Sequence, residues 1–192
     1  MKKGDFIELE YTGKVKDMDF VFDTTSEKEA KENNIHDAKA SYGPVVICIG
    51  QNHVIKGLDE QLEGKELGRE YKVELSPEKG FGKKNAKLIQ LVATNKFIKQ
   101  EINPMPGLQV NIDGMMGMIR TVSGGRTLVD FNHPLAGKEL IYDFKINKIV
   151  KDDEEKLRAL LKLQLNLKDI KVNIKEGNAN RLKHKAEFAK AY

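Results

Sequence analysis

Apolar and polar residues alternate at the start of the chain. Ile7, Leu9 and Tyr11 are separated by glutamates, and a period of two is typical of a strand with one buried face. The pattern predicts a strand that carries Tyr11 on its inner face and ends at Gly13. Shorter apolar runs predict further strands at 20–22, 45–49, 71–75, 127–131 and 140–146.

A different spacing marks one helix. Apolar residues at positions 54, 55, 58 and 62 recur every three or four positions, which places them on one face of a helix. Gly64 follows as a helix stop. Residues 26–41 are rich in Lys, Glu and Asn and are interpreted as a surface excursion with a short helix at 27–33.

The character of the chain changes after Lys83. Residues 84–129 begin with polar residues and continue as short strands separated by Asp113-Gly114 and Ser123-Gly124-Gly125, two sequences typical of hairpin turns. This stretch is interpreted as a small β module inserted between two strands of the surrounding domain. Four of the six methionines of the chain lie in it: Met105, Met115, Met116 and Met118.

The C-terminal stretch has a third pattern. Acidic residues at 152–155 precede an apolar stripe, and acids suit the first turn of a helix. The stripe consists of Leu157, Leu160, Leu161 and Leu165. Alternation at 170–174 predicts a strand, and a last helix is expected at 179–191.

Composition narrows the class of protein. The 192 residues are 40% hydrophobic and 32% charged, as in a soluble globular protein. Because no apolar stretch approaches the roughly 18 residues of a membrane span, the sequence predicts a cytoplasmic protein. Cys48 is the only cysteine, so no internal disulfide can form. Its apolar surroundings indicate a buried thiol rather than a nucleophile.

The charge is unevenly distributed. Residues 151–192 hold 11 lysines and arginines against 7 acids, which accounts for the whole formal charge of +4. A solvated helix face is the favoured interpretation. Nucleic-acid binding through this stretch is not expected, since the excess of positive charge is modest and the stretch carries no recognised motif.

One run stands out between the strands at 127–131 and 140–146. Residues 130–137 read Asp-Phe-Asn-His-Pro-Leu-Ala-Gly, longer than a hairpin needs and with an apolar tip. The run resembles the Asn-His-x-Leu-Ala-Gly segment of SlyD-like FKBP prolyl isomerases, the branch with a chaperone domain inserted in the flap. Other separated stretches resemble the same family in order and spacing: 11–13, 22–23, 50–58, 63–68 and 80–82.

The resemblance covers roughly residues 1–150 and implies an α+β fold. We expect an FKBP-type antiparallel β half-barrel wrapped on one helix, with an inserted small β domain and a C-terminal α/β extension, as in long-type members. The implied domains are 1–83 plus 130–151 for the isomerase, 84–129 for the inserted flap (chaperone) domain, and 152–192 for the C-terminal domain.

The implied activity is peptidyl-prolyl cis-trans isomerisation in an apolar pocket. The resemblance assigns catalytic roles to Tyr11, Asp23 and Tyr142. Tyr11 donates a hydrogen bond or packs, and Asp23 places a charge near the rotating carbonyl or holds the rim. The substrate-binding residues implied are Phe22, Ile47, Val54, Ile55, Leu58, Phe81 and Leu135. Since rotation makes and breaks no bond, no cofactor and no metal are expected, and His133 is interpreted as a turn-stabilising residue rather than a base.

Two positions depart from the family pattern. Leu58 stands where many members have Trp, and Phe81 where Tyr is usual, so a hydroxyl hydrogen bond to substrate is lost. These departures keep open an alternative, a holdase-type chaperone with a weak or inactive pocket.

The resemblance also implies partners. Unfolded or partly folded polypeptides with X–Pro bonds would bind the inserted domain, because methionine recurs on adaptable binding surfaces. The alternative is that Met115, Met116 and Met118 fill a small core. The C-terminal stretch is too small to fold alone, so it docks on the main domain or, as we expect, forms a homodimer.

Overall fold

The computed structural model describes residues 1–18 and 20–165. The chain forms two compact units, residues 1–150 and residues 151–192. The first unit contains two antiparallel sheets with separate hydrophobic cores.

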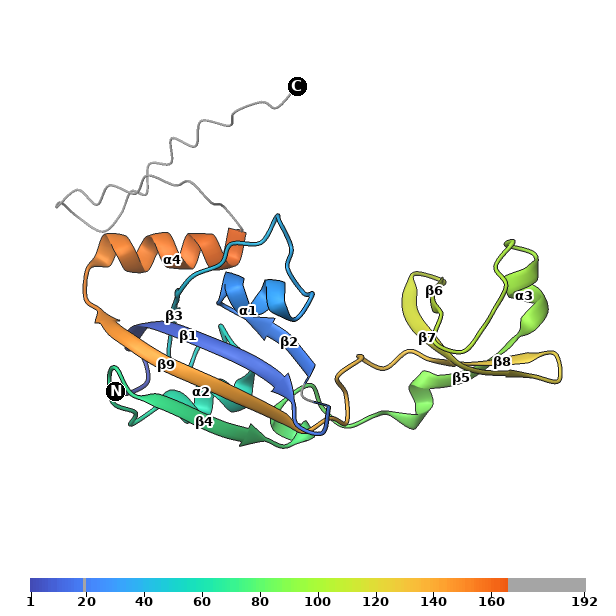
Figure 1. The fold of residues 1–192 in the computed structure, drawn as a ribbon, viewed down its shortest axis with the longest axis horizontal. Helices are drawn as coiled ribbons and strands as arrows, with labels where there is room; N and C mark the ends of the chain where they lie inside the picture. Colours follow the sequence, from blue (N-terminus) through green and yellow to red (C-terminus); the bar gives the residue numbers. More distant parts are fainter. Residues whose placement is uncertain (19, 166–192) are drawn as a thin grey trace, which may run out of the picture. The chain divides into compact units, whose positions relative to one another are not determined.

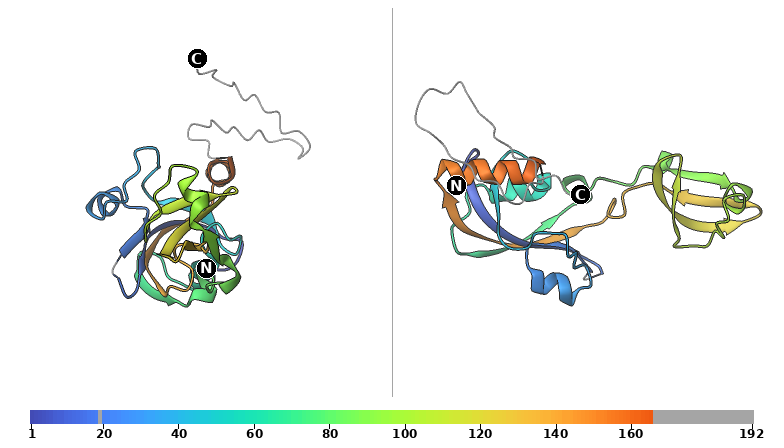
Figure 2. Two further views of the ribbon diagram at one scale, coloured as in Figure 1. Left: turned by 90° about the vertical axis from the view of Figure 1, so that its right-hand side faces the viewer. Right: turned by 90° about the horizontal axis from the view of Figure 1, so that it is seen from above.

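The first sheet has five strands, in the order β2-β1-β9-β4, with β3 also paired to β1. Its long strands β1 and β9 lie side by side over ten residue pairs, and α2 lies against one face of the sheet (Figures 1 and 2). The elements are β1 (Phe6–Val15), β2 (Phe20–Thr24), α1 (Glu27–Glu32), β3 (Val45–Cys48), α2 (Lys56–Leu62), β4 (Glu70–Leu75) and β9 (Leu140–Val150).

The predicted alternation determines which face of the first sheet is buried. Ile7 and Leu9 are fully buried on the inner face, where they meet Leu58 and Leu62 of α2. Burial of such side chains contributes about 1.5–3 kcal/mol each. The pattern thus places α2 on the inner face, as the spacing of its apolar residues predicts.

One boundary in β1 was predicted wrongly. Gly13 does not end the strand, which continues to Val15. Gly13 is paired on one side with Asp23 of β2 and on the other with Tyr142 of β9. It is a strand residue because neighbouring backbones on both sides supply its hydrogen bonds, which no local signal reveals.

The polar excursion at 26–41 is largely exposed, as predicted, and its expected short helix is α1. Ser26 accepts a hydrogen bond from the N–H of Glu29 and caps α1. Ala30 of this helix is fully buried. One side of the short helix therefore packs against the protein, while four of its six residues stay exposed to solvent.

The second sheet has four strands in the order β5-β8-β7-β6. Both predicted hairpin turns are confirmed: Asp113 and Gly114 have φ of 51° and 82°, and Gly124 and Gly125 have 56° and 70°, as two-residue type I′ turns require. The elements are β5 (Ile89–Ala93), α3 (Thr94–Ile98), β6 (Gln109–Ile112), β7 (Met115–Ser123) and β8 (Arg126–Asp130).

The polar character of the start of this segment predicts no regular element there, but the structure has β5 and α3. β5 pairs with β8, and Phe97 of α3 packs with Val110, Ile119 and Val129 in the second core. The uninterrupted apolar run of β5 is only three residues long, 91–93, so its structure depends on a partner 33 to 41 residues further along the chain.

Two linkers connect the sheets, one before β5 and one after β8 (Figure 1). They are joined by a group of four polar residues, here called the linker clasp: Lys84, Asn85, Asp130 and Asn132. Lys84 Nζ lies 2.9 Å from Asp130 Oδ2, and the Asn132 side chain donates to Asp130 Oδ1 at 2.7 Å. The Asp130 side chain is only 6% exposed.

The clasp predicts a specific dependence of stability on pH. Burial alone would raise the pKa of Asp130, but hydrogen bonds from Asn132 and Lys84 lower it to about 2. A lowered folded-state pKa stabilises the fold above the unfolded value of 3.8. This stabilisation, about 2 kcal/mol, is lost as the pH falls from roughly 4 to 2. Urea unfolding should show the wild type losing its advantage over Asp130→Asn across that range, and a constant difference would contradict the assignment.

The second unit begins with α4 (Asp153–Leu165). Asp152 caps it, since its carboxylate accepts a hydrogen bond from the N–H of Glu155 at 3.0 Å. The predicted helix start is confirmed. The strand expected at 170–174 and the helix expected at 179–191 lie outside the described residues. No helix in the described part is long and apolar enough to span a membrane.

Candidate functional site

An aromatic cluster lies on the inner face of the first sheet. The ring of Phe22 meets Tyr142 edge-on at a centroid distance of 5.8 Å and Phe81 edge-on at the same distance. Tyr11 lies 5.9 Å from Tyr142 in a tilted arrangement. Edge-to-face pairs at such distances are favourable for aromatic rings. Four of the residues predicted for the site are thus brought together from three strands and a loop.

A β-bulge orients Phe22 toward this cluster. Gly13 pairs with Asp23, whereas the next residue of β1, Lys14, pairs with Val21. Phe22 is therefore the extra residue of the bulge, and a bulge redirects side chains and increases the local twist. This device was not predicted, because an unpaired residue within a strand leaves no mark on the apolar pattern.

Gly13 makes room for the rings above it. A Cβ atom at this position would lie 2.8 Å from Phe22 Cζ and 2.9 Å from Tyr142 Cε1. Such distances are shorter than van der Waals contact, so any side chain would push the rings apart. The φ angle of Gly13 is not positive, so its backbone conformation does not require glycine. The glycine is needed because the rings approach it closely.

We expect Gly13→Ala to lower the free energy of unfolding by about 2 kcal/mol through this overpacking. Urea denaturation measures the loss. Adding Phe22→Leu, which shortens the clashing side chain, should recover part of it, since contacting residues are coupled. Additive losses in the double variant would show that the clash is not with Phe22.

The predicted apolar lining falls into two layers. Ile47 and Leu58 are 1% and 0% exposed and form a buried floor, so their predicted contact with substrate is indirect in this conformation. The partly buried residues packed on this core are Phe22, Val54, Ile55, Phe81 and Leu135. These five offer the accessible apolar surface.

A hydrogen-bonded pair lies at the edge of the cluster. The Tyr11 hydroxyl donates to Asp23 Oδ2 at 3.0 Å. Burial raises the pKa of Tyr11, and the Asp23 carboxylate adds to the rise. Removal from water likewise raises the pKa of Asp23, with the bond from Tyr11 opposing it. Burial also raises the pKa of Tyr142. Both tyrosines therefore remain protonated hydrogen-bond donors at neutral pH.

His133 covers Phe81 from the outside. The two rings are stacked, 3° from parallel, with centroids 4.5 Å apart. The Leu135 N–H donates to His133 Nδ1 at 3.2 Å, so the turn-stabilising interpretation of His133 is confirmed. The stack itself was not predicted, because nothing in the spacing of 81 and 133 places them together.

Comparison of the sequence with known protein families identifies the family of this chain. The family described as FKBP-type peptidyl-prolyl cis-trans isomerase matches residues 1–100, just over half of the chain. The chain belongs to this family. The predicted family, α+β fold and enzyme class, an FKBP-type peptidyl-prolyl cis-trans isomerase, are thereby confirmed. A second family, described as the FKBP26 IF domain, matches residues 90–135.

Individual relatives agree with the FKBP assignment. A short-type peptidyl-prolyl cis-trans isomerase of Methanocaldococcus jannaschii is 34% identical over 81% of this chain and 98% of that protein. An FKBP-type isomerase SlyD of Helicobacter pylori is 27% identical over 69% and 73%. Among solved structures, the three FKBP domains of wheat FKBP73 match with a TM-score of 0.41 and 16% identity, over 79% of this chain and 40% of that one.

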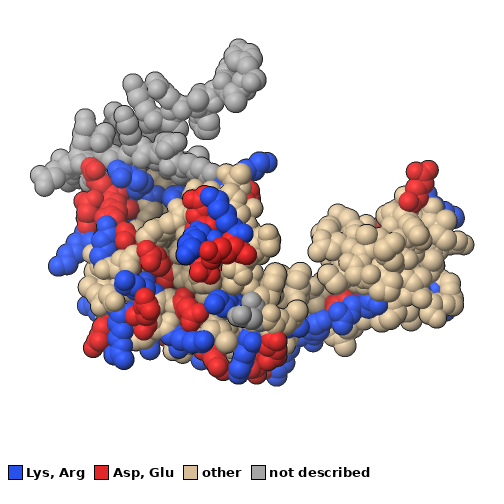
Figure 3. Space-filling view, viewed as in Figure 1, with Lys and Arg blue, Asp and Glu red and all other residues tan. Residues whose placement is uncertain are grey.

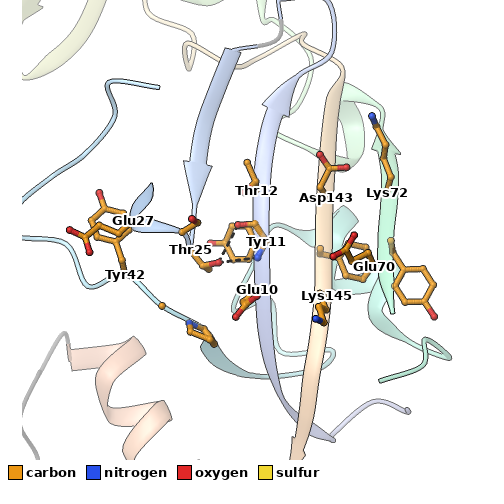
Figure 4. A pocket seen from close by; sticks show the side chains of 15 residues that line it. Glu10, Tyr11, Thr12, Thr25, Glu27, Tyr42, Glu70, Lys72, Asp143 and Lys145 are labelled. Atoms are coloured by element: carbon orange, nitrogen blue, oxygen red, sulfur yellow. Dashed lines mark hydrogen bonds between the residues drawn. The ribbon is translucent and has the colours of Figure 1, made fainter. Parts of the chain in front are cut away.

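A polar hollow of this FKBP chain lies on the other face of the sheet. Its volume is about 740 Å³. Two rows of polar residues cross it, and each row has one residue from β1, one from β9 and one from β4 (Figure 4). The rows are Glu10, Lys145 and Glu70, and Thr12, Asp143 and Lys72. Tyr11 is the only predicted site residue in its lining. Alternating charges across strands stabilise a solvated face, and the charged rows of this hollow distinguish it from the aromatic cluster.

The described residues contain no group of three or more His, Cys, Asp or Glu side chains placed to hold a metal ion. Cys48 is buried, and burial raises the pKa of its thiol. A raised pKa leaves little reactive thiolate. The interpretation of Cys48 as a buried thiol is confirmed.

Proposed function

We propose that the aromatic cluster is the site at which this FKBP chain isomerises X–Pro bonds. The observation that carries the proposal is the arrangement of Phe22 between Tyr142 and Phe81, above a Gly13 that leaves them room. Val54, Ile55 and Leu135 extend the same apolar surface. A proline ring is apolar and flat enough to pack against such a surface.

The chemistry required of the site is modest. Rotation about the amide loses resonance, with a barrier of about 18–20 kcal/mol, and needs no nucleophile. The twisted amide is less polar than the planar one, so it loses less on leaving water for an apolar pocket. A site that binds the twisted form better than the planar form accelerates exchange. A reduction of about 4 kcal/mol gives roughly a thousandfold gain in rate.

Tyr11 and Asp23 would act at the rim of the pocket. Because the Tyr11 hydroxyl donates a hydrogen bond to Asp23, the pair links β1 to β2 next to Phe22. This contact supports rim organisation and packing for both residues. A carboxylate at this position also puts negative charge near the carbon of a rotating carbonyl.

The first test is exchange of a short Ala-Leu-Pro-Phe-type peptide, followed by NMR with catalytic amounts of the full chain. We expect exchange, which takes tens to hundreds of seconds without catalyst, to become at least 100-fold faster at micromolar protein. A folded protein without any acceleration would favour the alternative, a holdase-type chaperone, which Leu58 and the missing hydroxyl at Phe81 keep open.

We also propose that the second sheet binds unfolded polypeptides, as the insert-in-flap domain of a long-type, SlyD-like member. Met105, Met115 and Met116 are 53%, 46% and 61% exposed, which argues against the alternative that they fill a core; Met118 is partly buried. Leu91 and Ile98 are exposed as well. Figure 3 shows few charged side chains on the visible face of this segment and many over the first sheet.

The proposed domains are 1–83 with 130–151, 84–129, and 152–192. Two sheets with separate cores support the first division, and the match to the FKBP26 IF domain overlaps the second range. We further propose a cytoplasmic protein that dimerises through residues 152–192. Light scattering at micromolar concentration tests the dimer, and a monomer mass would refute it.

A further inference from the structure

The linker clasp ties together the two chain segments that run to and from the second sheet. Asp130 Oδ1 accepts from the backbone N–H of Asn132 at 3.0 Å and from its side-chain amide at 2.7 Å, while Oδ2 accepts from Lys84 Nζ at 2.9 Å. The buried carboxylate is thus fully engaged by one residue of each linker.

Asn132 completes the tie through backbone atoms. Its Oδ1 accepts from the N–H of Asn85 at 2.7 Å, and its Nδ2 donates to the carbonyl of Asn85 at 3.1 Å. Such a reciprocal pair reproduces a β-type connection with a side chain. Substituting Asn132 should therefore loosen the tie between the linkers without removing any apolar contact from either core.

The clasp is also close in sequence to pocket residues on both linkers. The first linker reaches Lys84 three residues after Phe81, and the second runs from Asn132 directly to His133 and Leu135. Phe81 and His133 are stacked on each other, and the N–H of Gly137 donates to the carbonyl of Gly82 at 2.8 Å. A continuous set of contacts therefore leads from the pocket wall to the start of the second sheet.

We propose that Asp130 and Asn132 are positioning residues, which restrain the second sheet relative to the pocket and so couple client capture to isomerisation. The coupling part rests on the proposed function of the second sheet. A restrained tether gives a bound chain a higher effective concentration at the pocket than two free linkers would.

The test compares Asn132→Leu and Lys84→Met with Lys83→Met in the full chain. Lys83 pairs with Glu78 at 2.7 Å, within one linker, so it is a matched control that leaves the tie intact. Backbone ¹⁵N relaxation of residues 89–130 reports the motion of the second sheet independently of any client. We expect the clasp variants, and not the control, to give this sheet a shorter apparent correlation time than the first.

Function provides the second measurement. Exchange of a short X–Pro peptide should stay within about twofold, while catalysed refolding of a proline-limited protein falls about fivefold. Unchanged relaxation would overturn the restraint, and an equal loss of both activities would overturn the positioning role. If the wild type binds no unfolded chain, the proposed function of the second sheet fails, while relaxation still decides whether the clasp restrains it.

Discussion

Phe22→Ala is expected to lower kcat/KM for a short X–Pro peptide about 100-fold, which corresponds to about 2.7 kcal/mol of transition-state stabilisation. The ring of Phe22 is the contact between Tyr142 and Phe81. Its removal opens the wall of the pocket, admits water and weakens preferential binding of the twisted amide. Peptide exchange followed by NMR or by a coupled assay measures the loss.

The chain offers a matched control for this change. Phe20 lies on the same strand, two residues earlier, and is 48% exposed. Phe20→Ala removes the same number of atoms and should leave kcat/KM within about twofold. Circular dichroism must show both variants folded. An equal effect of the two substitutions, or none from Phe22→Ala, would place the pocket elsewhere.

Replacing residues 84–129 with a short turn is expected to separate two activities. Peptide isomerisation should remain within about threefold, because the first sheet has its own core. Catalysed refolding of a proline-limited protein should fall at least tenfold, since the deletion removes the proposed site for unfolded chains near the pocket. Both rates are measured at the same protein concentration, and a parallel loss would refute the division of roles.

Point substitutions give the same test without a deletion. Met115→Ser with Met116→Ser removes two exposed apolar side chains from the β6–β7 hairpin. Asn111→Ser, at the position paired with Met116, is the polar control. We expect only the methionine variant to weaken binding of a permanently unfolded protein, by about tenfold. A loss of binding in the control would indicate a general disturbance of the hairpin.

Local patterns were sufficient for several elements. The alternation in β1 and the spacing in α2 report burial directly, because side chains in strands repeat every two residues and in helices every 3.6. Asp113-Gly114 predicted its turn because its backbone requires positive φ. β5 and α3 were missed, since a short apolar run adopts a structure only when a distant strand pairs with it.

The sequence by itself determined the FKBP family and the order of most strands, because these depend on motifs of fixed spacing and on local periodicity. Tertiary structure alone decided how the residues of the proposed pocket are arranged. The bulge at Phe22, the space above Gly13, the stack of His133 on Phe81 and the burial of Asp130 each depend on atoms far apart in the chain. Contacts of this kind follow from three-dimensional packing, whose partners no local pattern specifies.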